Sequence, residues 1–238
     1  EIWDIDGGFV KKTSYPKFGG VSGIALSPDD KIIYAGHATL DAVLSMTDMS
    51  TMNLIDSKIG CGGDIALSPN GDYLFSVTGM TYQTRRSRIF NTITWAIYRE
   101  LPGVVKPKYS PTGEYVMGIN SKLEERTVIL YDVEKKSASY HTGHKGDLAD
   151  VCFTSDGKYV ISVATNSTGG PAKGGYRVWD VGNRQQIYEA PYFTGTSGFI
   201  DLSPDDQHYA AVGRGFIAIW KFRGILSGLK DVESGIGL

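Results

Sequence analysis

The sequence predicts an all-β fold in which one four-stranded antiparallel unit recurs along the chain. Three observations support this prediction: a turn signature that occurs five times, a second landmark with nearly the same spacing, and 30 glycines spread along the chain. A length of 238 residues is within the range of a single all-β domain. The hydrophobic fraction of 41% is sufficient for a substantial core.

The turn signature begins with Ser or Thr and continues through Pro, Ser, Thr, Asp, Asn or Gly residues. Its five copies are Ser27–Asp30, Ser68–Gly71, Ser110–Gly113, Thr154–Gly157 and Ser203–Asp206, at spacings of 41, 42, 44 and 49 residues. An apolar segment precedes each copy and another follows it. Two β-type segments joined by such a turn form a hairpin, so the sequence predicts five hairpins.

The second landmark is a four-residue string, and its strongest form contains an aromatic residue followed by Asp. It occurs once before the first hairpin and once after each hairpin, at residues 2–5, 46–49, 89–92, 130–133, 178–181 and 219–222. A more polar segment after the landmark fits a fourth, outer strand. A period of about 43 residues with four strands is typical of a β-propeller, whereas helical repeats would show a 3.6-residue periodicity.

The repeats divide the chain into one partial blade and five full blades. The full blades are expected at residues 20–60, 61–103, 104–146, 147–195 and 196–230, followed by a tail at residues 231–238. Residues 1–19 are expected to supply only the last two strands of a further blade. We therefore expect a sequence that starts within a blade of a six- or seven-bladed parent. A closed five-bladed ring with an extra hairpin is the alternative.

The turns, the pairs Trp3-Asp4, Tyr131-Asp132 and Trp179-Asp180, and the pair Gly143-His144 resemble the WD40 family. The resemblance covers about residues 1–224 and marks a diverged member. In this family a Gly-His pair can join an Asp, a Ser or Thr and the Trp in a buried hydrogen-bond network. The resemblance implies structural roles for Trp3, Asp4, Asp48, Tyr131, Asp132, His144, Ser162, Trp179, Asp180 and Trp220. The Asp of the network has no counterpart in the segment before Trp179.

The sequence shows no motif of a catalytic, cofactor-binding or metal site. A phosphate-binding Gly-x-x-x-x-Gly-Lys loop and a Gly-x-Ser-x-Gly elbow are both absent. His141 and His144 would need a helix and further ligands to form a zinc site, but their segment fits strand and turn. Cys61 and Cys152 lie in apolar segments and fit buried thiols, although the sequence leaves a disulfide open. We expect no enzyme activity and no cofactor.

Two connections are longer than the repeat requires, at residues 78–88 and 166–175. Each joins the second and third strands of a blade, so both are expected on one face of the ring, together with His37. Arg and Tyr are enriched in interface hot spots. The expected partner-binding residues are Tyr82, Arg85, Arg86, Arg88, Glu124, Arg126, Lys173 and Arg214.

These features predict a propeller that serves as a platform for other proteins, or for other domains of the same parent chain. Alternatives are a hydrolase or lactonase-like propeller with a pocket at the central channel, and a spacer within a larger assembly. The net charge of −2 gives no reason to expect nucleic acid binding. The sequence contains no run of 18 apolar residues, so it gives no reason to expect membrane insertion. The compartment is not identified by the residues, with a slight preference for the cytoplasm.

Overall fold

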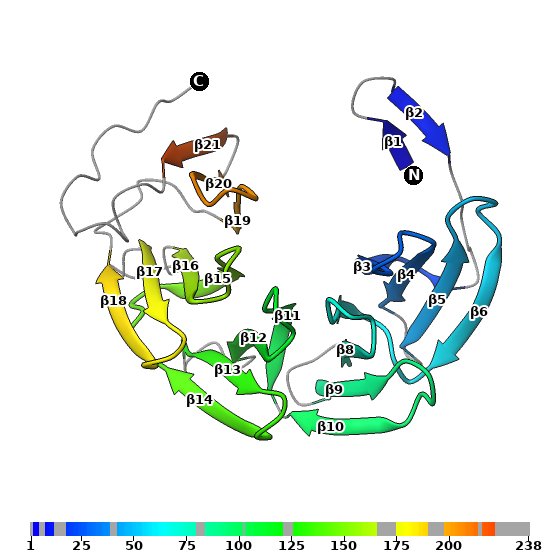
Figure 1. The fold of residues 1–238 in the computed structure, drawn as a ribbon, viewed down its shortest axis with the longest axis horizontal. Helices are drawn as coiled ribbons and strands as arrows, with labels where there is room; N and C mark the ends of the chain where they lie inside the picture. Colours follow the sequence, from blue (N-terminus) through cyan, green and yellow to red (C-terminus); the bar gives the residue numbers. More distant parts are fainter. Residues whose placement is uncertain are drawn as a thin grey trace. The chain divides into compact units, whose positions relative to one another are not determined.

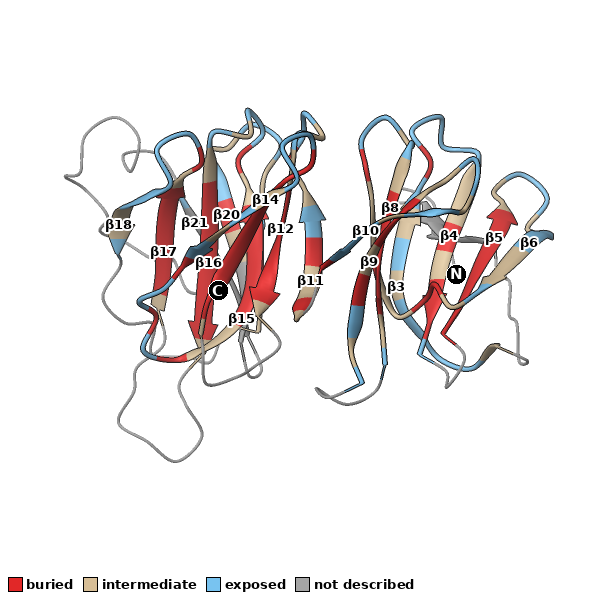
Figure 2. Ribbon diagram, turned by 90° about the horizontal axis from the view of Figure 1, so that it is seen from below, coloured by how far each residue is buried: buried red, intermediate tan, exposed pale blue. Residues whose placement is uncertain are grey.

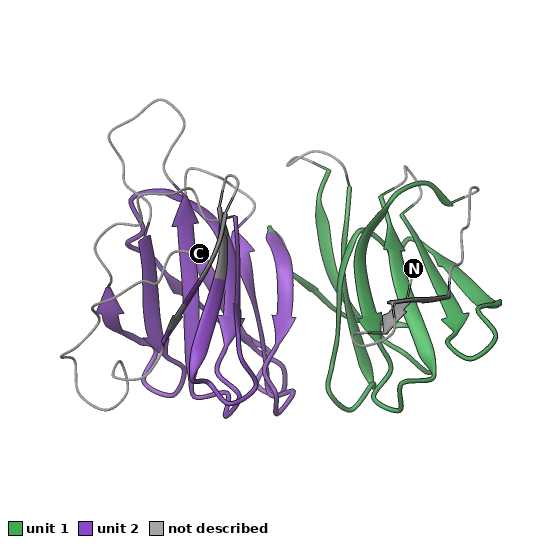
Figure 3. Ribbon diagram, turned by 90° about the horizontal axis from the view of Figure 1, so that it is seen from above, with its two compact units in different colours: residues 1–103 green, residues 104–238 purple. Residues whose placement is uncertain are grey.

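The computed structural model describes the backbone of most of the chain. The described residues are 2–4, 8–11, 18–38, 42–79, 84–101, 103–120, 126–165, 175–189, 198–213 and 216–221. They fold into two compact units, residues 1–103 and residues 104–238 (Figure 3). Within the described part, no helix has the length and hydropathy needed to cross a membrane.

The first unit contains two four-stranded sheets and a two-stranded sheet (Figure 1). Blade 1 has the order β3(Val21–Leu26), β4(Ile32–His37), β5(Val43–Asp48) and β6(Leu54–Ile59). Blade 2 has the order β7(Asp64–Leu67), β8(Tyr73–Thr78), β9(Arg86–Asn91) and β10(Ile97–Leu101). The two-stranded sheet pairs β1(Ile2–Asp4) with β2(Gly8–Lys11). Each strand pairs antiparallel with the next one along the chain.

The second unit repeats this order in two further four-stranded sheets and a three-stranded sheet. Blade 3 consists of β11(Val104–Tyr109), β12(Tyr115–Asn120), β13(Val128–Asp132) and β14(Ser137–His141). Blade 4 consists of β15(Asp147–Phe153), β16(Tyr159–Thr165), β17(Gly175–Asp180) and β18(Gln185–Glu189). Blade 5 contributes β19(Phe199–Leu202), β20(His208–Gly213) and β21(Phe216–Lys221) among the described residues. The prediction of antiparallel four-stranded blades is confirmed.

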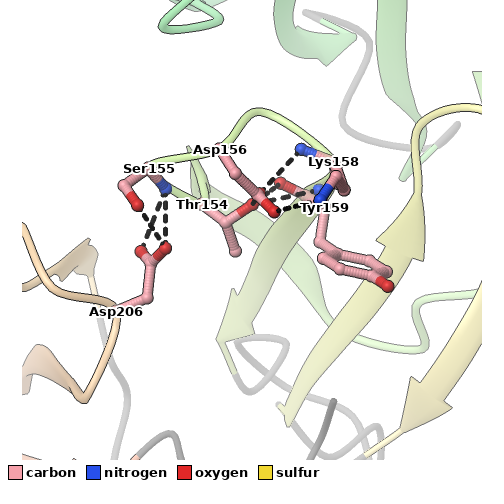
Figure 4. A network of polar contacts seen from close by, with 6 residues as sticks. All are labelled: Thr154, Ser155, Asp156, Lys158, Tyr159 and Asp206. Carbon is pink, nitrogen blue, oxygen red and sulfur yellow. Dashed lines mark hydrogen bonds and ion pairs between the residues drawn. The ribbon is translucent and has the colours of Figure 1, made fainter.

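The turn signature closes each hairpin through its own first side chain. In blade 4 the Thr154 hydroxyl accepts a hydrogen bond from the Tyr159 backbone N–H at 3.1 Å and donates to Asp156 at 2.7 Å (Figure 4). Asp156 in turn accepts the backbone N–H of Lys158 at 3.0 Å. Short polar side chains favour turns because they satisfy nearby backbone groups in this way. The same first-position contact recurs at Ser27, Ser68, Ser110 and Ser203.

The core lies between neighbouring blades within each unit. Figure 2 shows buried residues along the middle strands, such as β12, β16 and β17. One cluster joins Tyr34 and Leu44 of blade 1 to Ile65 and Leu74 of blade 2. Two further clusters join blade 3 to blade 4 and blade 4 to blade 5. A single four-stranded sheet cannot bury both of its faces, so each blade depends on its neighbour for a core.

One predicted connection is shorter than expected. Residues 78–88 were expected as a loop, but β8 extends to Thr78 and β9 already begins at Arg86. The reason is the register, because Thr78 pairs with Arg86 and Ser76 pairs with Arg88. Arg86 and Arg88 are therefore strand residues. Residues 166–174 of the second long connection lie outside the described residues.

Candidate functional site

Two of the arginines expected to bind a partner, Arg86 and Arg88, are held by one carboxylate. Glu100 on β10 lies 3.3 Å from Nη1 of Arg86 and 3.7 Å from Nε of Arg88. Arg86 remains largely exposed, with 62% of its side-chain surface accessible, whereas Arg88 retains 22%. Arg85 is half-buried. The structure therefore brings Arg86 and Arg88 of β9 together beside Glu100 of the outer strand β10.

Arg126 belongs to the second unit and is also held in place. Its Nη1 donates to the carbonyl of Lys145 at 2.5 Å, and its Nε lies 3.4 Å from the Asp147 carboxylate. These contacts tie the segment before β13 to the start of blade 4. The other expected binding residues, Tyr82, Glu124, Lys173 and Arg214, lie outside the described residues.

A buried polar network joins three of the residues that the sequence marked as structural. The indole N–H of Trp179 donates to the Ser162 hydroxyl at 2.8 Å, and Nε2 of His144 lies 2.6 Å from the same oxygen. All three side chains are buried. Because an indole N–H can only donate, Ser162 accepts from Trp179, and its own proton is available to the imidazole. The three residues come from the segment before β15, from β16 and from β17.

Electrostatics keep this imidazole neutral at neutral pH. Burial, with a smaller effect of the nearby Arg177 guanidinium, lowers the pKa of His144 to about 3. Arg177 is itself buried and donates to Gln186 at 2.7 Å and to Glu189 at 2.8 Å. A neutral ring with one acceptor nitrogen fits the Ser162 hydroxyl. The His–Ser–Trp network is therefore suited to holding strands together.

Gly143 is required by the same network. Its φ angle is +133°, a region that residues with a Cβ rarely adopt. A Cβ at this position would also collide with the guanidinium of Arg177. The Gly-His pair thus combines a backbone turn with close passage of an arginine side chain. Sequence reasoning missed Arg177, although it lies two residues before Trp179.

Two further histidines, His37 and His141, make structural contacts. His37 is buried, and its Nε2 lies 2.8 Å from the hydroxyl of buried Ser45. The expectation that His37 contributes to a binding face is therefore wrong, because its ring packs inside blade 1. His141 is also buried; its Nε2 lies 3.1 Å from Ser139, and its ring centroid lies 5.2 Å from that of Trp179. Burial lowers the pKa of His141.

The Asp residues of the second landmark cap the turn that follows the third strand. Asp48 accepts the backbone N–H groups of Ser50 and Thr51 at 2.9 and 2.8 Å. The hydrogen bond from the Ser50 hydroxyl, followed by those from the backbone N–H and the hydroxyl of Thr51, lowers the pKa of Asp48 to about 2. Asp132 and Asp180 each accept the N–H three residues later. Tyr131, which precedes Asp132, is fully buried; for Trp3, Asp4 and Trp220 the structure describes the backbone only.

A cluster that sequence reasoning missed lies on the first strands of blades 3, 4 and 5. The Lys106 ammonium donates to the Ala149 carbonyl and lies 4.7 Å from the centroid of the Phe199 ring. Asp150 is buried, accepts the Ile200 N–H at 3.2 Å, and has its pKa raised by burial. Lys106, Asp150 and Phe199 each stand four residues before the turn Ser or Thr, which is the signal that could have grouped them.

No three His, Cys, Asp or Glu residues of the described part lie close enough together to hold a metal ion. Cys61 and Cys152 are both buried free thiols, and burial raises the pKa of Cys61 to about 11. Burial raises the pKa of Cys152 as well.

Comparison with known proteins identifies the repeat. Residues 135–170 match the WD domain, G-beta repeat model. A comparison with curated proteins gives no match. These matched residues run from the end of blade 3 into the first hairpin of blade 4 and include His144 and Ser162.

Two solved structures show the same fold. A Kuenenia stuttgartiensis hydrazine synthase chain superposes with a TM-score of 0.73 at 18% identity, over 86% of this chain and 65% of that one. The β-propeller domain of Myceliophteria thermophila Cps50 (Swd1) superposes with a TM-score of 0.71 at 15% identity, over 92% of this chain and 71% of that one. This chain thus spans just under two thirds of the hydrazine synthase chain. At these identities the likeness shows the fold, and the predicted β-propeller is confirmed. The chain is a β-propeller, and its residues 135–170 match a WD40 repeat.

Proposed function

We propose that this chain is a non-catalytic platform that binds other proteins, or other domains of the same parent chain. WD40 propellers commonly have this role, and a fold alone does not choose the partner. The arrangement of the polar residues supports a non-catalytic role. The buried histidines, the turn serines and the capping aspartates are engaged in contacts within and between blades.

The observation that carries the proposal is the arginine pair at Glu100. An Arg side chain normally loses rotamer freedom when it binds, and holding it in place beforehand reduces that loss. Glu100 engages Arg86 at Nη1, and a guanidinium has five N–H donors, so further donors face outward. An exposed, held guanidinium fits an acidic group on a partner. We infer that Arg86 is the main partner-binding residue of the first unit, with Tyr82, Arg85 and Arg88 as further candidates there. Glu124, Arg126, Lys173 and Arg214 are separate candidates in the second unit.

The experiment compares partner capture by the native chain and by a variant with Arg85, Arg86 and Arg88 all replaced by Ala. Proteins recovered on the native chain are identified by mass spectrometry, purified, and titrated against both forms. We expect the triple variant to bind at least tenfold more weakly with an unchanged circular dichroism spectrum. Lys158→Ala is the control. This exposed cation lies in the turn before β16, at the end of a second strand that is opposite to the connection with the third strand. Equal binding by the native chain and the triple variant would contradict the proposal.

A further inference from the structure

The first strand of blade 1 differs from its counterparts in the other blades. Three residues before the turn Ser or Thr stand Ile65, Val151 and Ile200, which are 8%, 0% and 3% exposed. Each packs in a cluster with the preceding blade. The equivalent Ile24 of β3 is 65% exposed. Among the described residues of blade 1, this position therefore carries an apolar side chain without the cover that its counterparts have.

The second strand of blade 1 shows the same difference. Six residues after the turn Ser or Thr stand Leu74, Val160 and Tyr209, which are all buried against the preceding blade. The equivalent Ile33 of β4 is only half-buried. Figure 2 also shows β3 without a buried residue, and Val21 and Leu26 on that strand are exposed. We call Val21, Ile24, Leu26 and Ile33 the β3 face.

The neighbouring blades show which elements cover such a face. β7 packs against β3 and β4, β15 packs against β11 and β12, and β19 packs against β15 and β16. In each case the first strand of one blade contacts the first two strands of the blade before it. Those two strands form a hairpin joined by the turn signature. The natural cover for the β3 face is therefore a β-hairpin.

A polar contact at the turn adds chemical detail. The two carboxylate oxygens of Asp206 in blade 5 lie 3.0 and 2.9 Å from the backbone nitrogen of Ser155 in blade 4 and accept its N–H. The Ser155 hydroxyl also donates to this carboxylate, at 2.6 Å (Figure 4). Asp206 has a φ angle of +53°, where the equivalent Gly71 and Gly157 have +79° and +69°. The Asp thus occupies a backbone region that favours Gly and contacts the adjacent blade from there.

The residue at the fourth turn position, where Asp206 stands, is chemically suited to the second turn residue of the preceding blade. A Cβ on Gly71 would lie 3.1 Å from Cδ of Pro28, and a Cβ on Gly157 would lie 3.6 Å from Cδ of Pro111. Where the second turn residue is Pro, which has no N–H, the next blade carries Gly at its fourth turn position. Where the second turn residue is Ser155, which has an N–H and a hydroxyl, the next blade carries Asp at its fourth turn position.

Asp30 of blade 1 stands at the Asp206 position. Its φ angle is +56°, and its carboxylate has no hydrogen-bond partner among the described residues. By the pairing above, Asp30 matches a hairpin whose second turn residue has a free N–H, such as Ser. Asp30 lies at the end of the β3–β4 hairpin, next to the β3 face.

We propose that the β3 face and Asp30 bind a β-hairpin supplied by a polypeptide segment outside residues 1–238. The hairpin lays its apolar residues on Ile24 and Ile33 and donates the N–H of its second turn residue to Asp30. This site is separate from the Arg86 and Arg88 pair at Glu100 and does not depend on it. A second copy of this chain is a poorer match, because most of its hairpin turns carry Pro at the second position and the turn at Ser155 is already occupied by Asp206.

The test uses a synthetic peptide with the sequence of residues 147–165, which forms the β15–β16 hairpin with the Ser155 turn. Cys152→Ser in the peptide prevents its oxidation. We expect the labelled peptide to bind the full chain saturably and to protect the Ile24 amide from hydrogen exchange. Ile24→Asp in the chain should abolish binding. A Ser155→Pro peptide should bind the native chain roughly tenfold more weakly, because a charge-assisted hydrogen bond is lost.

Asp30→Gly provides the matched control, since Gly keeps the turn conformation and removes the acceptor. Both peptides should bind this variant equally. A second form of the test joins the hairpin to residue 1 through a Gly/Ser linker and measures the Tm and the hydrogen exchange of the Ile24 amide. This form tests the proposal even if the free peptide does not fold. The proposal is overturned if neither form protects Ile24, or if the Ser155 and Ser155→Pro peptides bind the native chain equally. Self-association of the chain that Ile24→Asp removes would also overturn it, in favour of a second copy.

Discussion

Blades 2 and 4 carry a serine at the same place on their second strands and use it differently. Ser162 of blade 4 lies between Trp179 and His144, at 2.8 and 2.6 Å. Ser76 of blade 2 donates to the Gly62 carbonyl at 2.9 Å, and Phe90 occupies the position of the Trp. Both hydroxyls are fully buried. The comparison teaches that the value of a buried serine depends on the groups that its removal would leave without partners.

A second pair of equivalent residues extends this comparison. Arg88 pairs with Glu100 across β9 and β10, and Arg177 pairs with Glu189 across β17 and β18. The first ion pair has an N–O distance of 3.7 Å and the second one of 2.8 Å. Arg177 is also the more buried of the two arginines. The same register position thus carries a loose pair in one blade and a close pair in the other.

The largest expected effect is that of replacing the two serines. Ser162→Ala leaves the Trp179 N–H and the His144 ring without their partner, and each buried unsatisfied group costs about 1–3 kcal/mol. We expect the free energy of unfolding to fall by about 3 kcal/mol. Ser76→Ala should cost about 1 kcal/mol, since it removes one neutral hydrogen bond. Urea unfolding followed by circular dichroism measures both, and equal costs would break the comparison.

Gly143→Ala should have the next largest effect. Both the positive φ angle and the collision with Arg177 act against a Cβ at this position. We expect a loss of about 2 kcal/mol, in line with other strained backbone positions. Gly182→Ala is the control, because a Cβ there meets only the Asp180 carboxylate at 3.4 Å. Thermal unfolding of the two variants tests this, and a similar Tm for both would show that the Gly-His turn has no special requirement.

The histidine of blade 4 should make stability depend on pH. The folded state lowers the pKa of His144 to about 3 from 6.5, so the unfolded chain binds the proton more readily. Stability is therefore retained above pH 6.5 and is lost as the pH falls from 6.5 towards 3. We expect a loss of about 2 kcal/mol between pH 7 and pH 5. His144→Gln should reduce this slope in urea titrations, and His141→Gln should reduce it further because burial lowers the pKa of His141 as well.

The smallest effects concern the two ion pairs. Glu189→Gln removes the charge partner of a buried arginine and should cost about 1 kcal/mol. Glu100→Gln removes a partly exposed pair and should cost less than about 0.5 kcal/mol. Chemical unfolding at low and high salt compares them. A larger cost for Glu100→Gln would mean that the closer pair is not the stronger one.

Much of the fold was predictable from the sequence because the turns are local. Ser27, Ser68 and their counterparts close hairpins through residues at most five positions away, so the pattern is visible in the sequence. The partners of His37 and Arg86 depend on strand register, which residue patterns do not specify. The sequence grouped His144 with Trp179, but it assigned His37 to the surface, where the structure buries it against Ser45.

The contacts between blades were the least predictable part. Lys106, Asp150 and Phe199 lie 44 and 49 residues apart in succession and meet only because blades 3, 4 and 5 place their first strands together. The same holds for Ser155 and Asp206, which are 51 residues apart. Such pairs become visible in a sequence only after its repeats have been aligned by their turns.

The most direct test of this account is a double-mutant cycle on Ser162 and Trp179. Trp179→Phe removes the indole N–H and gives blade 4 the aromatic residue that blade 2 has at Phe90. If Ser162 is valuable because of the groups it satisfies, Ser162→Ala should cost at least about 1 kcal/mol less in the Trp179→Phe background than in the native chain. The same cost in both backgrounds, within about 0.3 kcal/mol, would contradict the account.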